Sequence, residues 1–460
     1  MAYIKDTERL FQAIVDLDLD TVKEWLDQEG TNPNHRDHTG KTPLHLAAIT
    51  STPEIVQCLV DSGARLTARL TDGRTALHLA AFRGSAEIVR ILLNKSEQNE
   101  HEEQEREDNG PGNSTEDSKL LSSTTGESDC GNNDDDSTSA TGSFVKVRKE
   151  SNGSTTEVDA EEGDGLNLEP DVYDVNAVAW DYNASPLHLA IINGHVDVVE
   201  ELVTLGGANV LLPIKVKGRY GAPNAAILTL VLALNLPLEK AKAMITKLLE
   251  LGASPAQADT FFLTPLHHVA YYDDFAEIFD IFVEYNAPAV KRALNLLSTN
   301  FNSPLTVAIR FRRMRTACKL LEIGAKTSIE FNDFVKASSM DPTKDDMRKE
   351  FHDKIRQPII FAATNYEGPV VQKLLEKGAD PNTLSPFPTW WDWKGPNDTC
   401  VLDIVRYNIM LMQQYDGEGL DLHDPPIALD PDDNTYLGEF EKDTYKFFYA
   451  EMVNHLFGFL

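Results

Sequence analysis

Cysteine is scarce in this sequence of 460 residues, and its scarcity bears on the compartment. The four cysteines, Cys58, Cys130, Cys318 and Cys400, lie far apart and form no CxxC pair. Zinc sites and disulfide frameworks need cysteines at short, regular spacings, so this pattern argues against both. We therefore expect reduced thiols, no metal site and a cytoplasmic or nuclear location.

Long apolar runs are also missing. The most apolar stretch, 225–236, is interrupted by Thr229 and Asn235 and falls short of the roughly 20 residues that a transmembrane helix needs. The first residues carry charges where a signal peptide would need an unbroken apolar run. The sequence predicts neither a membrane span nor secretion by this route.

Basic charge is in short supply, because 42 Lys and Arg are set against 73 Asp and Glu, a formal net charge of −31. This excess repels phosphate backbones, so we expect no nucleic-acid partner. Protein partners with basic segments suit it better.

The signatures of common enzyme classes are missing as well. There is no GxSxG elbow, no GxxxxGK[ST] phosphate loop and no HExxH helix. We expect a protein without catalysis and without a cofactor.

What the sequence does contain is a repeat of about 33 residues. The heptapeptides 42–48 and 75–81 read TPLHLAA and TALHLAA, and a shift of 33 between 36–60 and 69–93 gives 12 identities in 25 positions. Related segments begin at Ser185, Thr264, Ser303 and Gln357. In period, motif and order, this pattern resembles the ankyrin repeat family.

The residues of one unit indicate a pair of helices. Thr42 is placed to cap a helix, and Pro43 suits the first helical position, where its missing N–H costs nothing. Apolar residues recur at helical spacing in a second segment, at Ile55, Val56, Leu59 and Val60. Gly40, Gly63 and Gly73 fall in turns that need a positive φ. One such unit cannot bury its apolar face, so neighbouring units must stack.

The resemblance implies an all-α solenoid of about nine units joined by β-hairpin-like loops and interrupted by an acidic insert. We divide the chain into N-terminal repeats (1–94), the insert (95–172), central repeats (173–327), a helical insertion (328–356) and degenerate C-terminal repeats with a capping helix (357–460). The weaker units are 10–30, 226–252 and 400–414.

The insert holds about half of the net charge. Residues 95–170 contain 21 Asp and Glu against 6 Lys and Arg, a net charge of −15, and are rich in Ser, Thr, Gly and Asn. This composition predicts a disordered loop between two stacked repeats.

Four histidines, His45, His78, His188 and His267, occupy the same motif position. A metal ladder or a catalytic base is one interpretation. The resemblance implies the other, in which each histidine is hydrogen-bonded between neighbouring turns, and we favour it.

Three groups of residues are candidates for partner binding. The resemblance places recognition at the hairpin tips and the concave face, which here means Arg36, Asp37, His38, Arg69, Leu70 and Asp72. A second group, Arg310, Arg312, Arg313 and Arg315, either clamps an anion or pairs with carboxylates of its own solenoid. The third, Trp390, Trp391 and Trp393, either anchors a partner or packs against the C-terminal helices.

One of these arginines also carries a structural expectation. Arg312 takes the position that Gly84 and Gly194 hold in other units. Because glycine is replaced there, we expect a different turn geometry.

These features together predict a non-catalytic scaffold that binds proteins, with an acidic loop that steers basic segments. Two alternatives stay open: an acidic, chaperone-like binder of basic proteins, and an enzyme with an unrecognised site within 361–460.

Overall fold

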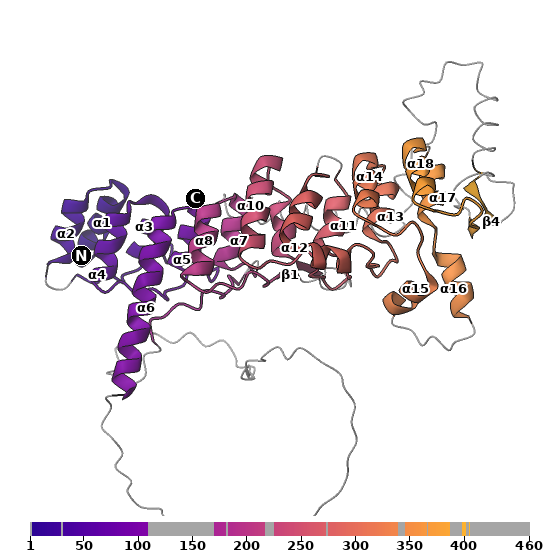
Figure 1. Cartoon of the computed structure of the whole chain (residues 1–460). Coiled ribbons are helices and arrows are strands. Elements are labelled where there is room, and N and C mark those ends of the chain that lie inside the picture. The colour runs from indigo at the N-terminus through magenta and orange to yellow at the C-terminus, as the bar shows by residue number, and fades with distance from the viewer. Residues whose placement is uncertain are drawn as a thin grey trace, which may run out of the picture. The chain divides into compact units, whose positions relative to one another are not determined.

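A computed structural model describes residues 2–28, 31–108, 170–180, 183–216, 225–272, 275–338, 346–365, 367–386, 398–401 and 404. The chain divides into two compact units, one of residues 1–98 with 171–460 and the other of residues 99–170. The first unit holds the repeats (Figure 1). Of the second, the structure describes residues 99–108 and Pro170.

The helices of the first unit follow one another in pairs. They are α1 (Ala2–Val15) with α2 (Leu19–Leu26), α3 (Pro43–Thr50) with α4 (Pro53–Asp61), α5 (Ala76–Arg83) with α6 (Ala86–Asp108), α7 (Pro186–Asn193) with α8 (Val196–Thr204), α9 (Thr229–Ala233) with α10 (Leu238–Glu250), α11 (Pro265–Ala270) with α12 (Ile278–Ala293), α13 (Pro304–Arg310) with α14 (Met314–Glu322), and α17 (Pro358–Thr364) with α18 (Gly368–Glu376).

Consecutive pairs stack through their first helices. Helix α1 contacts α3, and the row continues through α5, α7, α9, α11, α13 and α17 (Figure 1). This arrangement confirms the all-α solenoid. The described residues contain eight pairs, and of the ninth predicted unit, 400–414, only residues 400, 401 and 404 are described.

Side-chain caps start the first helices. Thr42, Thr75, Ser185, Thr264 and Ser303 each form a capping box with the residue three positions on. Each such cap stabilises its helix by about 1 kcal/mol. Small side chains then let neighbouring helices approach closely, since Ala47 and Ala80 are fully buried.

The turns confirm one prediction and correct another. Gly40, Gly63 and Gly73 have φ values of 80°, 85° and 82°, as the sequence predicts. Arg312 has a φ of 57°, so it adopts the same left-handed conformation as Gly84. The expected change of turn geometry is therefore wrong. The packing of helices α13 and α14 fixes the conformation of the turn between them. The left-handed backbone of Arg312 costs about 1 kcal/mol of strain.

The second interruption forms helices, as the sequence predicts. Helices α15 (Phe331–Ser338) and α16 (Met347–Lys354) pack against each other. Phe334 of α15 and Met347 of α16 pack with Leu297, Ile329 and Ile355 into a small separate core. Two antiparallel pairs complete the described elements: β1 (Ile214–Val216) with β2 (Ala225–Ile227), and β3 (Ser385–Pro386) with β4 (Asp398–Thr399).

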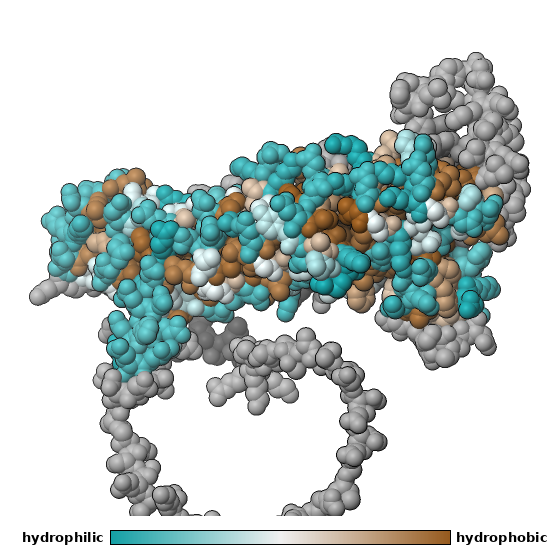
Figure 2. Space-filling view, in the orientation of Figure 1, coloured by the Kyte–Doolittle hydropathy of each residue, from teal (hydrophilic) through white to brown (hydrophobic). Residues whose placement is uncertain are grey.

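The first residues of the predicted insert form a helix rather than the expected disordered loop. Helix α6 runs to Asp108, well past the boundary at 95. Its end is hydrophilic (Figure 2), and Arg106 pairs with Glu102 and Glu103 one turn away. Once a packed segment has nucleated a helix, good helix formers extend it without an apolar face. The rest of the insert, 109–169, the predicted C-terminal helix and the three tryptophans of 390–393 lie outside the described residues.

Candidate functional site

Three of the four motif histidines, His78, His188 and His267, bridge consecutive repeats, and His45 makes only the bond to its own cap. In each, Nδ1 accepts a hydrogen bond from the backbone N–H of the capping residue, as from Ser185 to His188 at 3.0 Å. The other ring nitrogen then carries the proton, and in the bridging histidines it donates to a carbonyl of the next hairpin: His78 to Ala177 at 3.1 Å and His188 to Leu212 at 2.7 Å. This geometry confirms the structural interpretation.

Burial keeps these rings neutral. It lowers the pKa of His188 and His267 to about 4 and that of His78 to about 3. His45, at about 4, is shifted first by burial and then by the Arg36 charge. Its Nε2 has no hydrogen-bond partner of normal geometry, although the Ala68 and Arg74 backbone groups favour the protonated ring. Within the described residues, no three His, Cys, Asp or Glu side chains gather as a metal site would require.

Two arginines 33 residues apart brace the first two hairpins. Arg36 Nη1 donates to the Gly40 carbonyl at 2.7 Å and to the Arg69 carbonyl at 2.9 Å. Arg69 Nη1 donates to the Gly73 carbonyl at 2.7 Å. Each guanidinium is thus fixed on its own hairpin, and Arg36 also ties the first hairpin to the second.

The other predicted tip residues divide between surface and core. His38 is exposed, and Asp37 and Asp72 are half-buried. Asp37 accepts hydrogen bonds from Thr39 and Lys41, which hold its hairpin in shape. Leu70 is only 7% exposed and belongs to the core, so its expected contact with a partner is wrong. Its backbone N–H closes the hairpin and its side chain turns inward.

Trp180 is a tip residue that the sequence interpretation missed. Its side chain is 62% exposed. Its backbone N–H donates to the Asp72 carbonyl at 2.9 Å, and its indole lies against Gly73, where an added Cβ would come within 2.7 Å of it. Arg69 Cζ is 6.0 Å from the indole centroid, at the outer limit of a cation–π contact. The signal was available, because Trp180 precedes the cap Ser185 by five residues.

A cavity of about 390 Å³ opens beside Arg69. The described residues that line it are Asn34, Arg36, Thr42, Arg65, Thr67, Ala68 and Arg69. Three are arginines and none is acidic. We call this cavity the arginine pocket.

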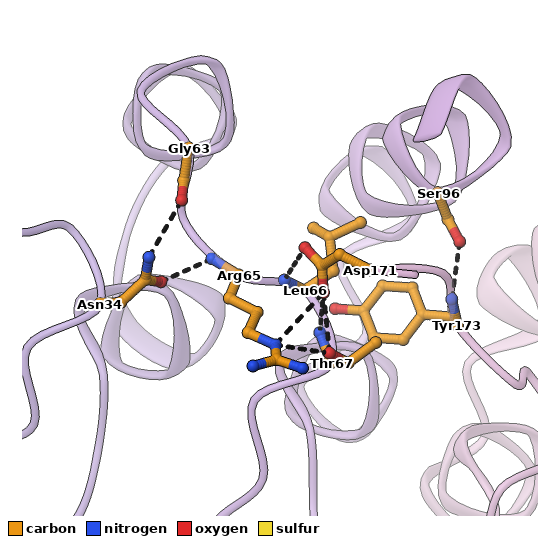
Figure 3. A network of polar contacts seen from close by, with 8 residues as sticks. All are labelled: Asn34, Gly63, Arg65, Leu66, Thr67, Ser96, Asp171 and Tyr173. Atoms are coloured by element: carbon orange, nitrogen blue, oxygen red, sulfur yellow. Dashed lines mark hydrogen bonds and ion pairs between the residues drawn. The ribbon is translucent and has the colours of Figure 1, made fainter. Parts of the chain in front are cut away.

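Asp171, the first residue of the repeat-containing unit after residues 99–170, contacts two residues that line the arginine pocket, Arg65 and Thr67. Figure 3 shows these contacts. The Asp171 carboxylate accepts hydrogen bonds from the backbone N–H groups of Leu66 and Thr67, both at 2.8 Å. Arg65 Nε lies 4.0 Å from the same carboxylate and donates to Thr67 Oγ1 at 3.1 Å. The segment is fixed again two residues on, where the Tyr173 N–H donates to Ser96 Oγ.

The side chains of the other predicted arginine group differ in their contacts and in their exposure. Arg313 Nε donates to the Tyr271 carbonyl at 2.8 Å, and its guanidinium lies 5.7 Å from the Tyr271 ring centroid. Arg310 is half-buried, whereas Arg312 and Arg315 are exposed. The pKa of Glu277 is lowered first by its hydrogen bond to Lys242 and to a lesser degree by Arg315. Arg313 therefore joins two repeats of its own solenoid.

The capped and stacked helix pairs define this chain as a helical-repeat protein. Comparison with known proteins agrees with this class. A family model for ankyrin repeats in three copies matches residues 10–103, and a model for a single ankyrin repeat matches 182–215. The chain is an ankyrin-repeat protein, and ankyrin repeats are protein–protein interaction modules.

Two solved structures illustrate the similarity. The ankyrin repeat domain of Bcl-3, a unique member of the IkappaB protein family, is 20% identical over 68% of this chain and 96% of its own, with a TM-score of 0.43. The ankyrin repeat protein EF0377 is 18% identical over 61% of this chain and 98% of its own, with a TM-score of 0.39. No curated protein sequence matches the chain.

No helix among the described residues is both long and apolar enough to cross a bilayer.

Proposed function

We propose that this protein is a non-catalytic scaffold that binds protein partners through the tips of its hairpins. The contact surface is centred on Trp180 and includes Arg36, His38, Arg69 and Asp72. The exposed indole of Trp180 carries the proposal. A tryptophan is seldom left largely exposed, and tryptophan is enriched among the residues that dominate binding energy at interfaces.

The rigidity of the tips supports this function. The arginines that brace the two hairpins and the bond from Trp180 to Asp72 hold the surface in place before any partner arrives. Docking on a preorganised surface loses less conformational entropy, so more of the contact energy remains as affinity.

The test replaces Trp180 by a photo-crosslinking residue, with the same replacement at Tyr285 as the control. Tyr285 is a 42%-exposed aromatic on helix α12. We expect the Trp180 position to crosslink to a partner that Tyr285 does not capture. Trp180→Ala should then lower the affinity for the purified partner by about 100-fold, the scale of an interface hot spot. Tyr285→Ala should leave this affinity unchanged. Equal affinity of the two alanine variants would overturn the proposal.

The acidic insert gives a second role to the same scaffold. With a net charge of −15 in residues 95–170, it suits the steering of basic segments toward the solenoid. Replacement of 109–169 by a flexible Gly/Ser linker of about 12 residues keeps helix α6 and the contacts of Asp171, because a linker of this length spans the distance from the end of the helix. The replacement should slow association with a basic partner at low salt. If it abolished binding at equilibrium instead, the insert itself would be the binding site, as in an acidic chaperone.

A further inference from the structure

We propose that the arginine pocket binds a phosphorylated serine or threonine side chain of a protein partner. The inference rests on the proposed function, because it names the chemistry that the hairpin tips would recognise. It adds Arg65 to the binding residues and assigns an acidic ligand to a protein whose total charge favours basic ones.

The guanidinium groups of the pocket keep donors for a ligand. Arg36 and Arg69 use Nη1 for the carbonyls of their hairpins. A guanidinium has five N–H donors, so Nε and Nη2 of each remain for an anion. Their positions are already fixed by the hairpins, which lowers the entropy cost of binding.

The charge of the pocket suits a phosphate better than a carboxylate. Three arginines line it, and the nearby Asp171 offsets part of the Arg65 charge from 4.0 Å. A carboxylate brings a single negative charge, whereas a phosphoester brings −1.5 to −2 charges and three acceptor oxygens. Planar guanidinium groups bind such oxygens through paired hydrogen bonds.

The setting of the pocket favours a protein-borne phosphate. The cavity, at about 390 Å³, has room for a side chain together with its backbone. Arg69 both lines the pocket and faces the indole of Trp180. A peptide could therefore place a phosphorylated residue in the pocket and lay a neighbouring apolar residue on Trp180.

The test measures fluorescence anisotropy of the full chain with a degenerate phosphoserine peptide pool and with the same pool carrying serine. We expect the phosphoserine pool to bind at least about tenfold more tightly, the scale of one charge-assisted hydrogen bond. Arg36→Gln and Arg69→Gln should each remove most of this difference. Arg90→Gln is the matched control, because Arg90 lies on helix α6 in an ion pair with Glu201. Equal binding of the two pools would overturn the inference.

A second measurement uses the unaltered protein, since the glutamine variants also lose hairpin contacts. Inorganic phosphate is titrated while the Nε–H signals of the arginines are followed by NMR. Arg36, Arg65 and Arg69 should shift and saturate together, and Arg90 should not. Equal small shifts at all four would mean nonspecific ion binding and would also overturn the inference.

The two proposals can fail separately. If the serine and phosphoserine pools bind alike while Trp180→Ala still releases the crosslinked partner, the phosphate pocket is wrong and the scaffold surface stands. If the phosphoserine pool binds more tightly than the serine pool but Trp180→Ala leaves the affinity for the partner unchanged, the phosphate pocket stands and the proposed partner surface is wrong.

Discussion

Two regions of the solenoid share the same helix pair but are linked by different polar contacts. In helices α5, α7 and α11, a buried histidine joins the cap of one repeat to the hairpin of the next. In helices α13 and α17, the same position holds Thr306 and Ile360, and the Thr306 hydroxyl bonds back to its own Ser303. The stack continues through both regions. Apolar packing and helix caps therefore carry the architecture, and the histidine adds a titratable link to part of it.

Other contacts between repeats are made by different residue types in the two regions. His195 bonds the Phe82 carbonyl of the preceding repeat, Arg313 bonds that of Tyr271, and Asn365 bonds that of Ile309. All three side chains come from the turn or helix end after the first helix of a repeat. The backbone carbonyl is the fixed partner in each case, so any donor of suitable reach satisfies it.

Acid should destabilise the repeats that are linked by histidine more than the repeats of α13 and α17, and this is the largest effect we expect. The folded pKa values of His78, His188 and His267 lie well below the usual 6.5. The unfolded chain therefore binds more protons, so the stability contribution is complete above pH 6.5 and is lost as pH falls toward 4. By pH 5 the loss is about 2 kcal/mol per histidine. Hydrogen-exchange protection factors, which correct for the slower intrinsic exchange in acid, should fall in α5 and α7 between pH 7 and 5 far more than in α17.

The matched control for acid is α17, where Ile360 does not titrate. An equal fall of the protection factors in α7 and α17 would contradict the assignment of the acid response to the histidines.

Replacing the glycine of each of two hairpins by alanine should distinguish the cost of backbone strain from the cost of a steric clash. Gly40 and Gly73 have nearly the same φ, 80° and 82°. An added Cβ meets nothing within 4 Å at Gly40, whereas at Gly73 it comes within 2.7 Å of the Trp180 ring and 2.9 Å of its backbone nitrogen. Gly40→Ala should cost about 1 kcal/mol of unfolding free energy through strain alone.

Gly73→Ala should cost about 1–2 kcal/mol more than Gly40→Ala, because the clash forces the backbone of the next hairpin to move. Urea unfolding measures the difference in unfolding free energy between the two variants. The tryptophan fluorescence spectrum of the folded protein should change in the Gly73 variant only, because Trp180 contacts Gly73. If the two variants were equally stable and kept the same spectrum, Trp180 would not be seated on Gly73.

The sequence was sufficient for the parts of the structure that depend on local chemistry. The caps and the left-handed glycines follow from residue types at fixed spacing, the bridging role of the histidines follows from the resemblance to ankyrin repeats, and the structure confirms them. Contacts between distant segments could not be predicted. Asp171 meets Leu66 across 105 positions of sequence, and the arginine pocket exists only because two hairpins lie side by side.

Burial at the tips was equally hard to predict. Leu70 and Trp180 both lie near the bend of a hairpin, yet one is in the core and the other is largely exposed. Their side chains differ in direction rather than in hydrophobicity, and direction depends on loop length. The loop that contains Trp180 closes from Ala184 to Ala179, one residue longer than the loop that closes from Arg74 to Leu70.

Replacing Arg312 by glycine should have the smallest effect of these substitutions, and it is the only one that we expect to raise stability. Arg312 holds a left-handed φ of 57° at an exposed position, and its equivalents Gly84 and Gly194 hold φ values of 90° and 77° without strain. Arg312→Gly should therefore raise the unfolding free energy, by up to about 1 kcal/mol, because relief of strain exceeds the entropy that glycine adds to the unfolded chain. Arg315→Gly, inside helix α14, is the control and should lower stability by a similar amount. If Arg312→Gly also lowered stability, the arginine side chain would be making contacts worth more than the strain of its turn.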